Sequence, residues 1–323
     1  MKGKGEKSLK KIKGMLFLFV GFTLAGTSVI SARVIMGKLG TFTITSVSLF
    51  FALLCLLPLV RGKLFIIRQL KFTDWFSLIF QAVFGIFLFR MFLLYGLRHT
   101  TSAEAGILTG ATPAVTALLA RFLLKEKMNG RKWIGIIGTV TGILIIQGLF
   151  LPGNRLLPEH SIGNLLILCA CASESSFNVC SRILAVKKQD GLRESLPPMV
   201  QTLLVSAIAL LLCLAPAIFE QPMTGLLQLG IRDWLALFWY GAFVTAVAFI
   251  CWYAGIRRCS ATTAAAFSGM MPFTALVLSV LLLKEPAGLQ QWLGGALIIL
   301  GMVLIGTGED ETTETVDNSG KIG

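Results

Sequence analysis

Charged residues are scarce in this chain: they make up 14% of its 323 residues, against roughly 25% in a typical soluble domain. So few charges could not cover the surface of a water-soluble globule of this size. The hydrophobic share is 55% and the mean hydropathy is +0.80. The apolar residues also come in long runs, such as Phe50–Val60, Leu203–Ala215 and Leu276–Leu283. Composition therefore predicts a protein of the membrane.

Histidine is also rare, with two residues in the whole sequence. No His-Glu-x-x-His pair occurs, no glycine loop stands between a strand and a helix, and no Ser–His–Asp set falls within the apolar runs. The seven cysteines lie within or at the ends of apolar segments, and no histidine accompanies the close pair Cys169 and Cys171. We therefore expect no metal site, no cofactor and no enzyme activity.

The apolar runs are long enough to cross a bilayer, which takes about 20 predominantly apolar residues in a helix. They lack the strict alternation of barrel strands, and backbone groups in lipid must be bonded internally, so helices are predicted. We expect an all-α integral membrane protein with ten transmembrane helices. The predicted spans are 14–36, 41–60, 73–95, 101–123, 131–150, 162–186, 196–219, 233–256, 261–283 and 291–307.

The N-terminus allows two interpretations. A basic stretch, MKGKGEKSLKKIKG, precedes the apolar MLFLFVGFTLAG, and Ser28–Ala32 could pass for a signal-peptidase site. However, Gly14–Arg33 aligns without gaps on Gly163–Arg182, which lies in the middle of the chain and cannot be a signal. We therefore expect a retained first helix, preceded by a basic segment at 1–13.

The formal net charge of +13 would suggest nucleic-acid binding in a soluble protein. Here the positive residues lie in loops between apolar segments, where the preference of Lys and Arg for cytoplasmic loops explains them. Twenty of the 29 fall on the side that holds the N-terminus and five on the other. We therefore predict both termini in the cytoplasm, the basic N-terminal segment against anionic lipid, and no nucleic-acid partner.

The two halves of the chain are related by a repeat. LLKEKMNGRKWIG at 123–135 recurs 159 positions later as LLKEPAGLQQWLG at 282–294. The second copy has lost the positive charges of Lys127, Arg131 and Lys132, which become Pro286, Gln290 and Gln291. A unit of five spans places its two copies in opposite orientations, which explains why only the cytoplasmic copy stays basic. The sequence thus predicts a 5+5 inverted repeat, with halves at 14–150 and 162–307, as in many transporters.

The repeated motif also resembles that of a known family. It runs from Tyr95-Gly96-Leu97-Arg98 through Pro113, Glu126 and Trp133, and again from Tyr253-Ala254-Gly255-Ile256-Arg257 through Pro272, Glu285 and Trp292. This pattern resembles the drug/metabolite transporter superfamily, specifically a protein of two EamA domains, over about residues 14–307. The resemblance implies a carrier of small metabolites, amino acids or drugs without an ATPase motif. The second helix departs from the family, because Ser48-Leu49-Phe50 stands where an Arg-Phe pair is common.

Glu174 is the clearest candidate for function, because it lies about midway along the sixth predicted span and a charge at the bilayer centre costs about 3 kcal/mol or more. Helical spacing places it on one stripe with Cys171, Asn178 and Arg182. The first span carries a milder stripe of Thr23, Thr27 and Ser31. One interpretation is a cavity wall in which Glu174 accepts a proton or a substrate amine. The other is a structural carboxyl group between helices.

Arg90 and Glu104 form a second candidate pair, since adjacent antiparallel spans could bring them to a similar depth. A structural ion pair and a functional pair fit equally well. Glu126 and Glu285 are interpreted as markers of helix ends.

Prolines 113 and 272 follow small residues, Gly110 and Gly269, in equivalent spans. Each removes a backbone donor, so both a kinked hinge and plain close packing fit. For the aromatic residues near span ends an interfacial belt is expected, with a cavity position as the alternative for Trp252. These residues are Tyr95, Trp239, Tyr240, Trp252 and Tyr253.

The tail 308–323 carries five acidic residues and is predicted to be disordered. Together these features predict a multi-pass carrier of the cell membrane whose partners are a small-molecule solute and lipid, as a monomer or a homodimer. We expect export by alternating access, with proton exchange. Uptake by the same fold and a non-transporting membrane scaffold are the alternatives, and a scaffold would not need the polar stripe at Glu174.

Overall fold

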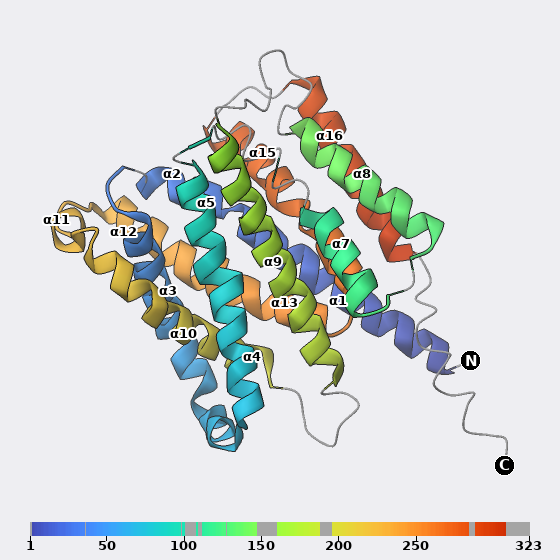
Figure 1. Ribbon diagram of the computed structural model, residues 1–323, viewed down its shortest axis with the longest axis horizontal. Helices are drawn as coiled ribbons and strands as arrows, with labels where there is room; N and C mark the ends of the chain where they lie inside the picture. The colour runs from blue at the N-terminus through green and yellow to red at the C-terminus, as the bar shows by residue number, and fades with distance from the viewer. Residues whose placement is uncertain are drawn as a thin grey trace.

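The computed structural model describes residues 2–35, 37–97, 99–100, 108, 112–126, 128–146, 160–187, 196–283 and 288–307. Within these ranges the chain is helical and has no strand (Figure 1). Several sequence-based expectations lie outside them. They concern Glu104, Gly110, Glu285 and the tail 308–323.

Helices of the first half follow the predicted spans with two interruptions. A turn at Thr27 divides the first span, and a π-helical segment lies within the third. The elements are α1 (Lys2–Gly26), α2 (Ser28–Ile35), α3 (Thr41–Val60), η1 (Arg61–Gln69), α4 (Phe72–Ala82), η2 (Val83–Leu88), α5 (Phe89–Leu97), α7 (Thr112–Leu123) and α8 (Gly130–Ile146).

The second half repeats this order. Its third helix is again divided by a π-helical segment, and its fourth is broken at Ser268, four residues before Pro272. The elements are α9 (Ser161–Lys187), α10 (Pro198–Ile218), α11 (Pro222–Leu226), α12 (Ile231–Trp239), η4 (Tyr240–Val247), α13 (Ala248–Ile256), α14 (Ala261–Phe267), α15 (Met270–Leu283) and α16 (Leu289–Thr307).

Among the described residues, six helical runs are long and apolar enough to cross a membrane: Thr41–Gln69, Phe72–Leu93, Ser161–Ile183, Pro198–Ile218, Ile231–Ile256 and Ala261–Leu282. Two shorter apolar helices, Thr112–Leu123 and Leu289–Ile305, accompany them. The predicted all-helical, multi-pass class is therefore confirmed. The count of ten spans stays a prediction.

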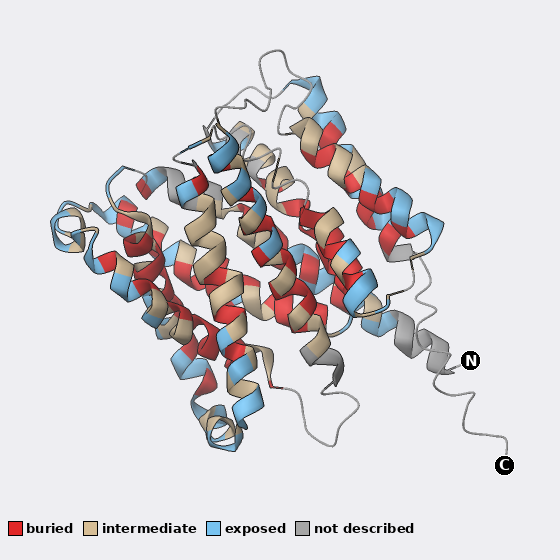
Figure 2. Cartoon of the chain, in the orientation of Figure 1, coloured by how far each residue is buried: buried red, intermediate tan, exposed pale blue. Residues whose placement is uncertain are grey.

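The exterior of the bundle is apolar and its interior carries hydroxyl groups. Phe72, Phe122 and Leu211 are 85%, 74% and 70% exposed, whereas Thr45 and Thr116 are fully buried. Figure 2 shows the exposed residues along the outer sides of the helices. Exposed apolar area on this scale would be unfavourable in water and suits a surface covered by lipid.

The two π-helical segments occupy equivalent places. At the repeat offset of 159, residues 83–88 correspond to 242–247, which lie within η4. A π-turn widens the helix and leaves a carbonyl group available to a side chain. Ser173 Oγ donates to Phe84 O at 2.9 Å, and Thr245 Oγ1 donates to Tyr240 O at 2.9 Å. Side-chain hydroxyls thus stabilise both widened segments.

Helices α8 and α16 pack backbone to backbone through glycines. A Cβ atom on Gly142 would lie 2.5 Å from Gly294 O, and one on Gly135 would lie 2.7 Å from Gly301 O. Because the earlier glycine of one helix meets the later glycine of the other, α8 and α16 run antiparallel. Side chains larger than hydrogen would push these helices apart.

Three other helix pairs have extensive contacts: α3 packs on α10, α1 on α13, and α5 on α9. Each pair joins a helix of the first half to one of the second. The largest hydrophobic cluster lies where these pairs meet, with Leu18 of α1, Phe177 of α9 and Tyr253 of α13 among its members. The two halves are therefore interleaved rather than separate bodies.

Candidate functional site

Glu174 lies at the centre of the inward face of α9. Residues one and two turns away on this face are buried, namely Ile167, Ala170 and Ser181. The opposite face is exposed at Leu165, Leu168 and Ala172. Glu174 nevertheless keeps part of its surface accessible. Because its neighbours on the same face are buried against other helices, Glu174 lies on the side of α9 that faces the bundle interior.

Two neighbours of the Glu174 carboxyl group are polar. Cys171 lies one turn earlier on α9 and its Sγ donates to Leu108 O at 3.6 Å. Thr112, at the start of α7, places its side chain beside the carboxyl group. Thr112 Oγ1 is buried and has no hydrogen-bond partner of standard geometry among the described residues. A carboxyl group with a spare hydroxyl beside it can hold a proton or receive an ammonium group.

Serines on either side of Glu174 fix α9 against its neighbours. Thr116 Oγ1 of α7 donates to Ser175 Oγ at 3.0 Å, and Ser175 Oγ donates to Thr112 O at 3.5 Å. On the other side, Ser173 bonds to Phe84 of the π-helical segment η2. These bonds hold the part of α9 that carries Glu174 between α7 and η2.

The two remaining residues of the predicted stripe, Asn178 and Arg182, lie in different surroundings. Asn178 is 5% exposed and continues the inward face of α9 one turn beyond Glu174. Arg182 instead donates from Nη1 to Ile256 O at 2.8 Å, at the C-terminal end of α13. A cation at this position satisfies a terminal carbonyl group of that helix. The stripe thus divides into an interior part, Cys171 to Asn178, and an end contact.

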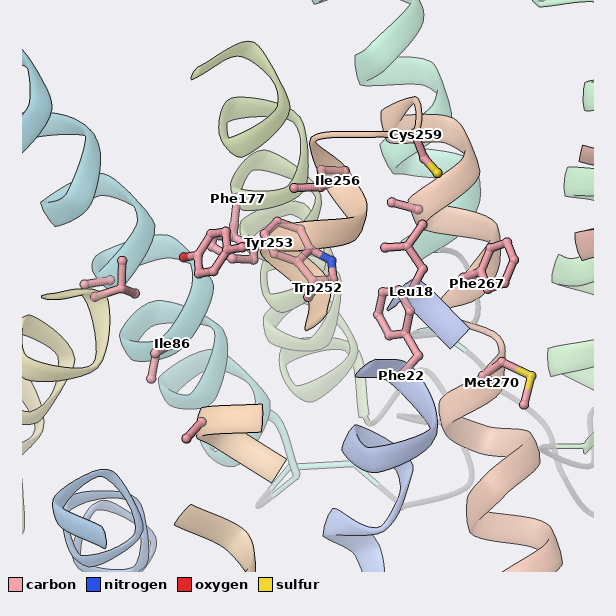
Figure 3. Packing of buried hydrophobic residues seen from close by; sticks show 14 of the residues in the cluster. Leu18, Phe22, Ile86, Phe177, Trp252, Tyr253, Ile256, Cys259, Phe267 and Met270 are labelled. Carbon is pink, nitrogen blue, oxygen red and sulfur yellow. The ribbon is translucent and has the colours of Figure 1, made fainter. Parts of the chain in front are cut away.

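An aromatic layer adjoins this face of α9 (Figure 3). The Phe177 and Trp252 rings stack with centroids 4.7 Å apart, and the Trp252 and Tyr253 rings meet edge to face at 5.0 Å. Trp252 and Tyr253 are 7% and 1% exposed, so the interfacial belt is wrong for both. Tyr253 Oη is buried and has no hydrogen-bond partner in the part of the chain that the structure describes.

The polar stripe of the first span lies elsewhere. Thr27 Oγ1 donates to Leu24 O at 2.6 Å and accepts from Trp239 Nε1 at 2.9 Å, and Ser31 Oγ donates to Thr27 O at 3.5 Å. Ser31 lies on α2, which packs on α12 and α15, whereas α9 packs on α5 and α7. The structure therefore does not bring Thr27 and Ser31 together with Glu174, and their hydroxyls mainly support the turn at Thr27.

Arg90 of α5 contacts a hydroxyl group and an aromatic ring. Its Nη1 donates to Thr45 Oγ1 at 2.6 Å, and its guanidinium carbon lies 5.3 Å from the centroid of the Tyr240 ring. Its predicted partner Glu104 lies outside the described residues. Arg90 is half-buried and, among the described residues, forms no ion pair. A guanidinium with spare donors in an apolar segment is suited to receive an anionic group.

Two glutamates make contacts that sequence reasoning missed. Glu126, after α7, accepts hydrogen bonds from Ala261 N at 2.9 Å, Thr262 N at 3.3 Å and Thr262 Oγ1 at 2.7 Å. Glu220, after α10, accepts from Phe42 N at 3.1 Å, Thr43 N at 2.8 Å and Thr43 Oγ1 at 2.8 Å. Each carboxylate binds the N-terminus of a helix in the other half. The recurrence of Leu-Leu-Lys-Glu was the available signal for Glu126, and Glu220 had none.

The predicted hinge positions are described in part. Pro272 follows the break between α14 and α15, where Ser268 Oγ donates to Ala265 O at 2.7 Å. A Cβ atom on Gly269 would lie 2.8 Å from Ile298 Cγ2, so this glycine also serves close packing. Pro113 is buried in the first turn of α7, and Gly110 lies outside the described residues. Whether these positions move stays a prediction. Across the described residues, no three metal-binding side chains gather.

Comparison with known proteins agrees with this architecture. The model of the EamA-like transporter family matches residues 12–148 and 161–307. The chain is similar to the uncharacterized transporter YetK of Bacillus subtilis, with 30% identity over 306 residues, or 93% of this chain and 89% of that protein. It is also similar to a probable sugar phosphate/phosphate translocator of Arabidopsis thaliana, with 27% identity over 197 residues, or 60% of each. A solved crystal structure has the same fold, with a TM-score of 0.72 at 20% identity over 91% of this chain and 96% of that one.

Proposed function

This chain belongs to the EamA-like transporter family, and from that premise we propose that it exports a small organic solute in exchange for protons. It is a multi-pass membrane protein whose relatives are transporters. The observation that carries the proposal is the position of Glu174. Glu174 is half-buried at the centre of an otherwise buried helix face, midway along a membrane span. Intramembrane carboxyl groups that face the bundle interior are typical of proton and substrate pathways.

In the proposed cycle Glu174 binds either a proton or the solute's positively charged group. Deprotonated, it attracts an ammonium group, with the Thr112 hydroxyl beside it and the Phe177–Trp252 layer nearby for apolar contact. A proton taken up from outside neutralises the carboxylate and releases the solute there. One proton then moves inward for each solute that leaves. Exclusive occupancy of one carboxyl group by proton or solute couples the two fluxes.

Alternating access requires two halves that rock against each other around this site. The antiparallel contact between α8 and α16, which are equivalent helices of the repeat, supports an inverted 5+5 arrangement. The other helix pairs support this arrangement as well, because they are related by the repeat. When each helix is replaced by its equivalent in the other half, the α1–α13 pair becomes the α9–α5 pair, and the α3–α10 pair becomes itself. With the bias of Lys and Arg, we place both termini in the cytoplasm and the protein in the cell membrane.

The test begins by finding a solute. The purified protein is screened by thermal shift against amino acids, sugars, nucleosides and organic cations, because a ligand that binds the folded state raises its melting temperature. The most stabilising compound is then followed in proteoliposomes that contain a pH-sensitive dye. We expect its efflux from the vesicles to acidify their lumen in the wild type, because one proton enters for each solute that leaves.

Glu174→Gln keeps the size of the side chain and removes its exchangeable charge. We expect this variant to lose the coupling between solute and proton while still inserting and folding. Asp74→Asn, which changes a carboxylate near the start of α4, is the matched control and should keep full coupling. Unchanged flux and unchanged pH dependence in Glu174→Gln would refute the role of Glu174. If none of the compound classes stabilised or crossed, the membrane scaffold would replace the carrier.

A second candidate solute class is an organic anion, and Arg90 favours it. Its described contacts are a hydroxyl and an aromatic ring, so a carboxylate or phosphate group could complete its surroundings. One relative is named as a probable sugar phosphate/phosphate translocator, which is a further reason to include phosphate esters in the screen. If the solute is anionic, Arg90→Lys should raise its KM, because a lysine cannot reproduce a bidentate contact. An unchanged KM would remove Arg90 from the binding site.

A further inference from the structure

We propose that Glu126 and Glu220 are two clasps that close opposite ends of the solute pathway, and that release of one clasp opens one face. The Glu126 clasp is the contact of Glu126 with Ala261 and Thr262. The Glu220 clasp is the contact of Glu220 with Phe42 and Thr43. The proposal rests on the proposed function, because a pathway must exist for clasps to close it.

The two clasps share one chemistry. In each, the two carboxylate oxygens accept two backbone N–H groups from the first turn of a helix and the hydroxyl of a threonine in that turn. First-turn N–H groups have no partner within their own helix, and the helix dipole favours negative charge there. Hydrogen bonds to a charged acceptor are stronger than neutral ones. Such a contact holds firmly when made, yet it is local enough to break as one unit.

Both clasps join the two halves of the repeat. Glu126 comes from the end of α7 in the first half and binds α14 in the second. Glu220 comes from the end of α10 in the second half and binds α3 in the first. Rocking of one half against the other therefore has to strain or release each of these contacts. A cap that lies within a single helix would move with that helix and would not be strained.

The clasps also lie at opposite ends of one long helical run. Lys38 Nζ, two residues before Gly40 at the start of α3, bonds to Asp233 at the start of the run Ile231–Ile256 at 2.7 Å. Helix α14, which Glu126 binds, begins directly after the other end of that run, beyond Ile256. At 1.5 Å per residue the 26-residue run is roughly 39 Å long. One clasp therefore closes one face of the membrane and the other the opposite face.

In this structure both clasps are made at once, so both ends are closed. Alternating access needs one end to open while the other stays shut, because two open ends would leak. Loss of a single carboxylate should therefore favour the state that is open at its own end. By the predicted topology, that is the cytoplasmic face for Glu126 and the outer face for Glu220.

Cys171 provides the readout, since it is 1% exposed and lies one turn from Glu174 inside the bundle. In a variant that keeps Cys171 and replaces the other six cysteines by serine, a charged, membrane-impermeant thiol reagent is applied to vesicles of either orientation. We expect slow reaction from both sides. Glu126→Gln should accelerate it on the order of tenfold from the cytoplasmic side, and Glu220→Gln similarly from the outside, since each loses a charge-assisted contact.

Asp74→Asn is the matched control. Asp74 also caps a helix N-terminus, accepting from Lys71 N at 3.0 Å, but that contact stays within α4 and its own N-cap, so labelling of Cys171 should not change. Thr262→Val and Thr43→Val are the second pair. Each removes one hydroxyl from its clasp without changing charge, and each should give a smaller change from the same side as its glutamate variant.

Several results would overturn the clasps: acceleration from the same side in both glutamate variants, no acceleration in either the glutamate or the threonine variants, or fast labelling of the wild type from both sides. Labelling does not depend on flux or on the identity of the solute. If coupling survives Glu174→Gln while the two-sided labelling pattern is seen, the role of Glu174 fails and the clasps stand. If Glu174→Gln instead abolishes coupling and the two-sided labelling pattern is absent, the proposed carrier function stands and the clasps are refuted.

Discussion

Phe177 of α9 and Trp252 of α13 stack with their ring centroids 4.7 Å apart and their planes 22° apart. Tyr253 meets the same phenylalanine edge to face at 6.4 Å. These rings pack between helices that are far apart in the sequence. Because lipid is as apolar as the side chains themselves, helices inside a membrane associate through close packing more than through exclusion of water. The stacked pair should therefore be a main source of stability in this region.

Trp252→Ala should destabilise the protein by about 3–5 kcal/mol, since it deletes a buried indole and leaves a cavity beside Phe177. Trp252→Phe should recover much of this loss by keeping an aromatic ring against the same partner. The measurement is the melting temperature of the purified protein in detergent. Trp239→Ala is the control, because Trp239 is 39% exposed and should affect stability less. Equal effects of the two alanine variants would contradict the importance of the stack.

Two glycines one turn apart on α8 should respond in opposite ways to alanine. A Cβ atom on Gly142 would lie 2.5 Å from Gly294 O, so Gly142→Ala should overpack the contact with α16 and cost about 1–3 kcal/mol. A Cβ atom on Gly138 would find its nearest neighbour at 3.8 Å, and Gly138→Ala should be neutral or stabilising by up to about 1 kcal/mol. The measurement is the melting temperature of both variants under the same conditions. Similar melting temperatures would argue against a close α8–α16 contact.

The sequence predicted more of the helices than of the site. Apolar runs and the repeat located the helices, because hydrophobicity in a membrane depends on each residue's own side chain. The π-helical segment at Val83–Leu88 and the turn at Thr27 left no such signal. Both depend on partners elsewhere in the fold, such as Ser173 for Phe84 and Trp239 for Thr27.

The same distinction separates the site residues. Glu174 was recognisable because a carboxyl group midway along an apolar span is unusual whatever surrounds it. Glu220 was not, since a glutamate at the end of a span is ordinary until its contact with Thr43 is known. Spacing predicts that Arg182 extends the Glu174 stripe, because it gives the direction of a residue around a helix but not the reach of a long side chain. Its guanidinium in fact reaches the end of α13.

Asp233 should matter more for stability than its partner Lys38. The Lys38 side chain is 50% exposed, and an exposed ion pair contributes little because solvent screens it. Asp233 also accepts a hydrogen bond from Gly230 N at 2.9 Å, which caps the start of α12. We therefore expect Asp233→Ala to lower the melting temperature more than Lys38→Ala does, and added salt to reduce the Lys38 effect by a larger fraction than the Asp233 effect, since the cap is not an ion pair. A larger effect of Lys38→Ala would show that the ion pair outweighs the cap.

Arg131 and Gln290 occupy equivalent positions in the first turns of α8 and α16, and both side chains are exposed. The antiparallel contact of these helices places their first turns at opposite ends of the pair. In a background without native cysteines, Arg131→Cys should react with an impermeant thiol reagent only from the cytoplasmic side and Gln290→Cys only from outside. The charges of the two loops agree with this expectation, since the basic loop at Arg131 is the one predicted to lie in the cytoplasm. Labelling of both from one side would mean that the two halves insert in parallel, and a midplane site between inverted halves could not then exist.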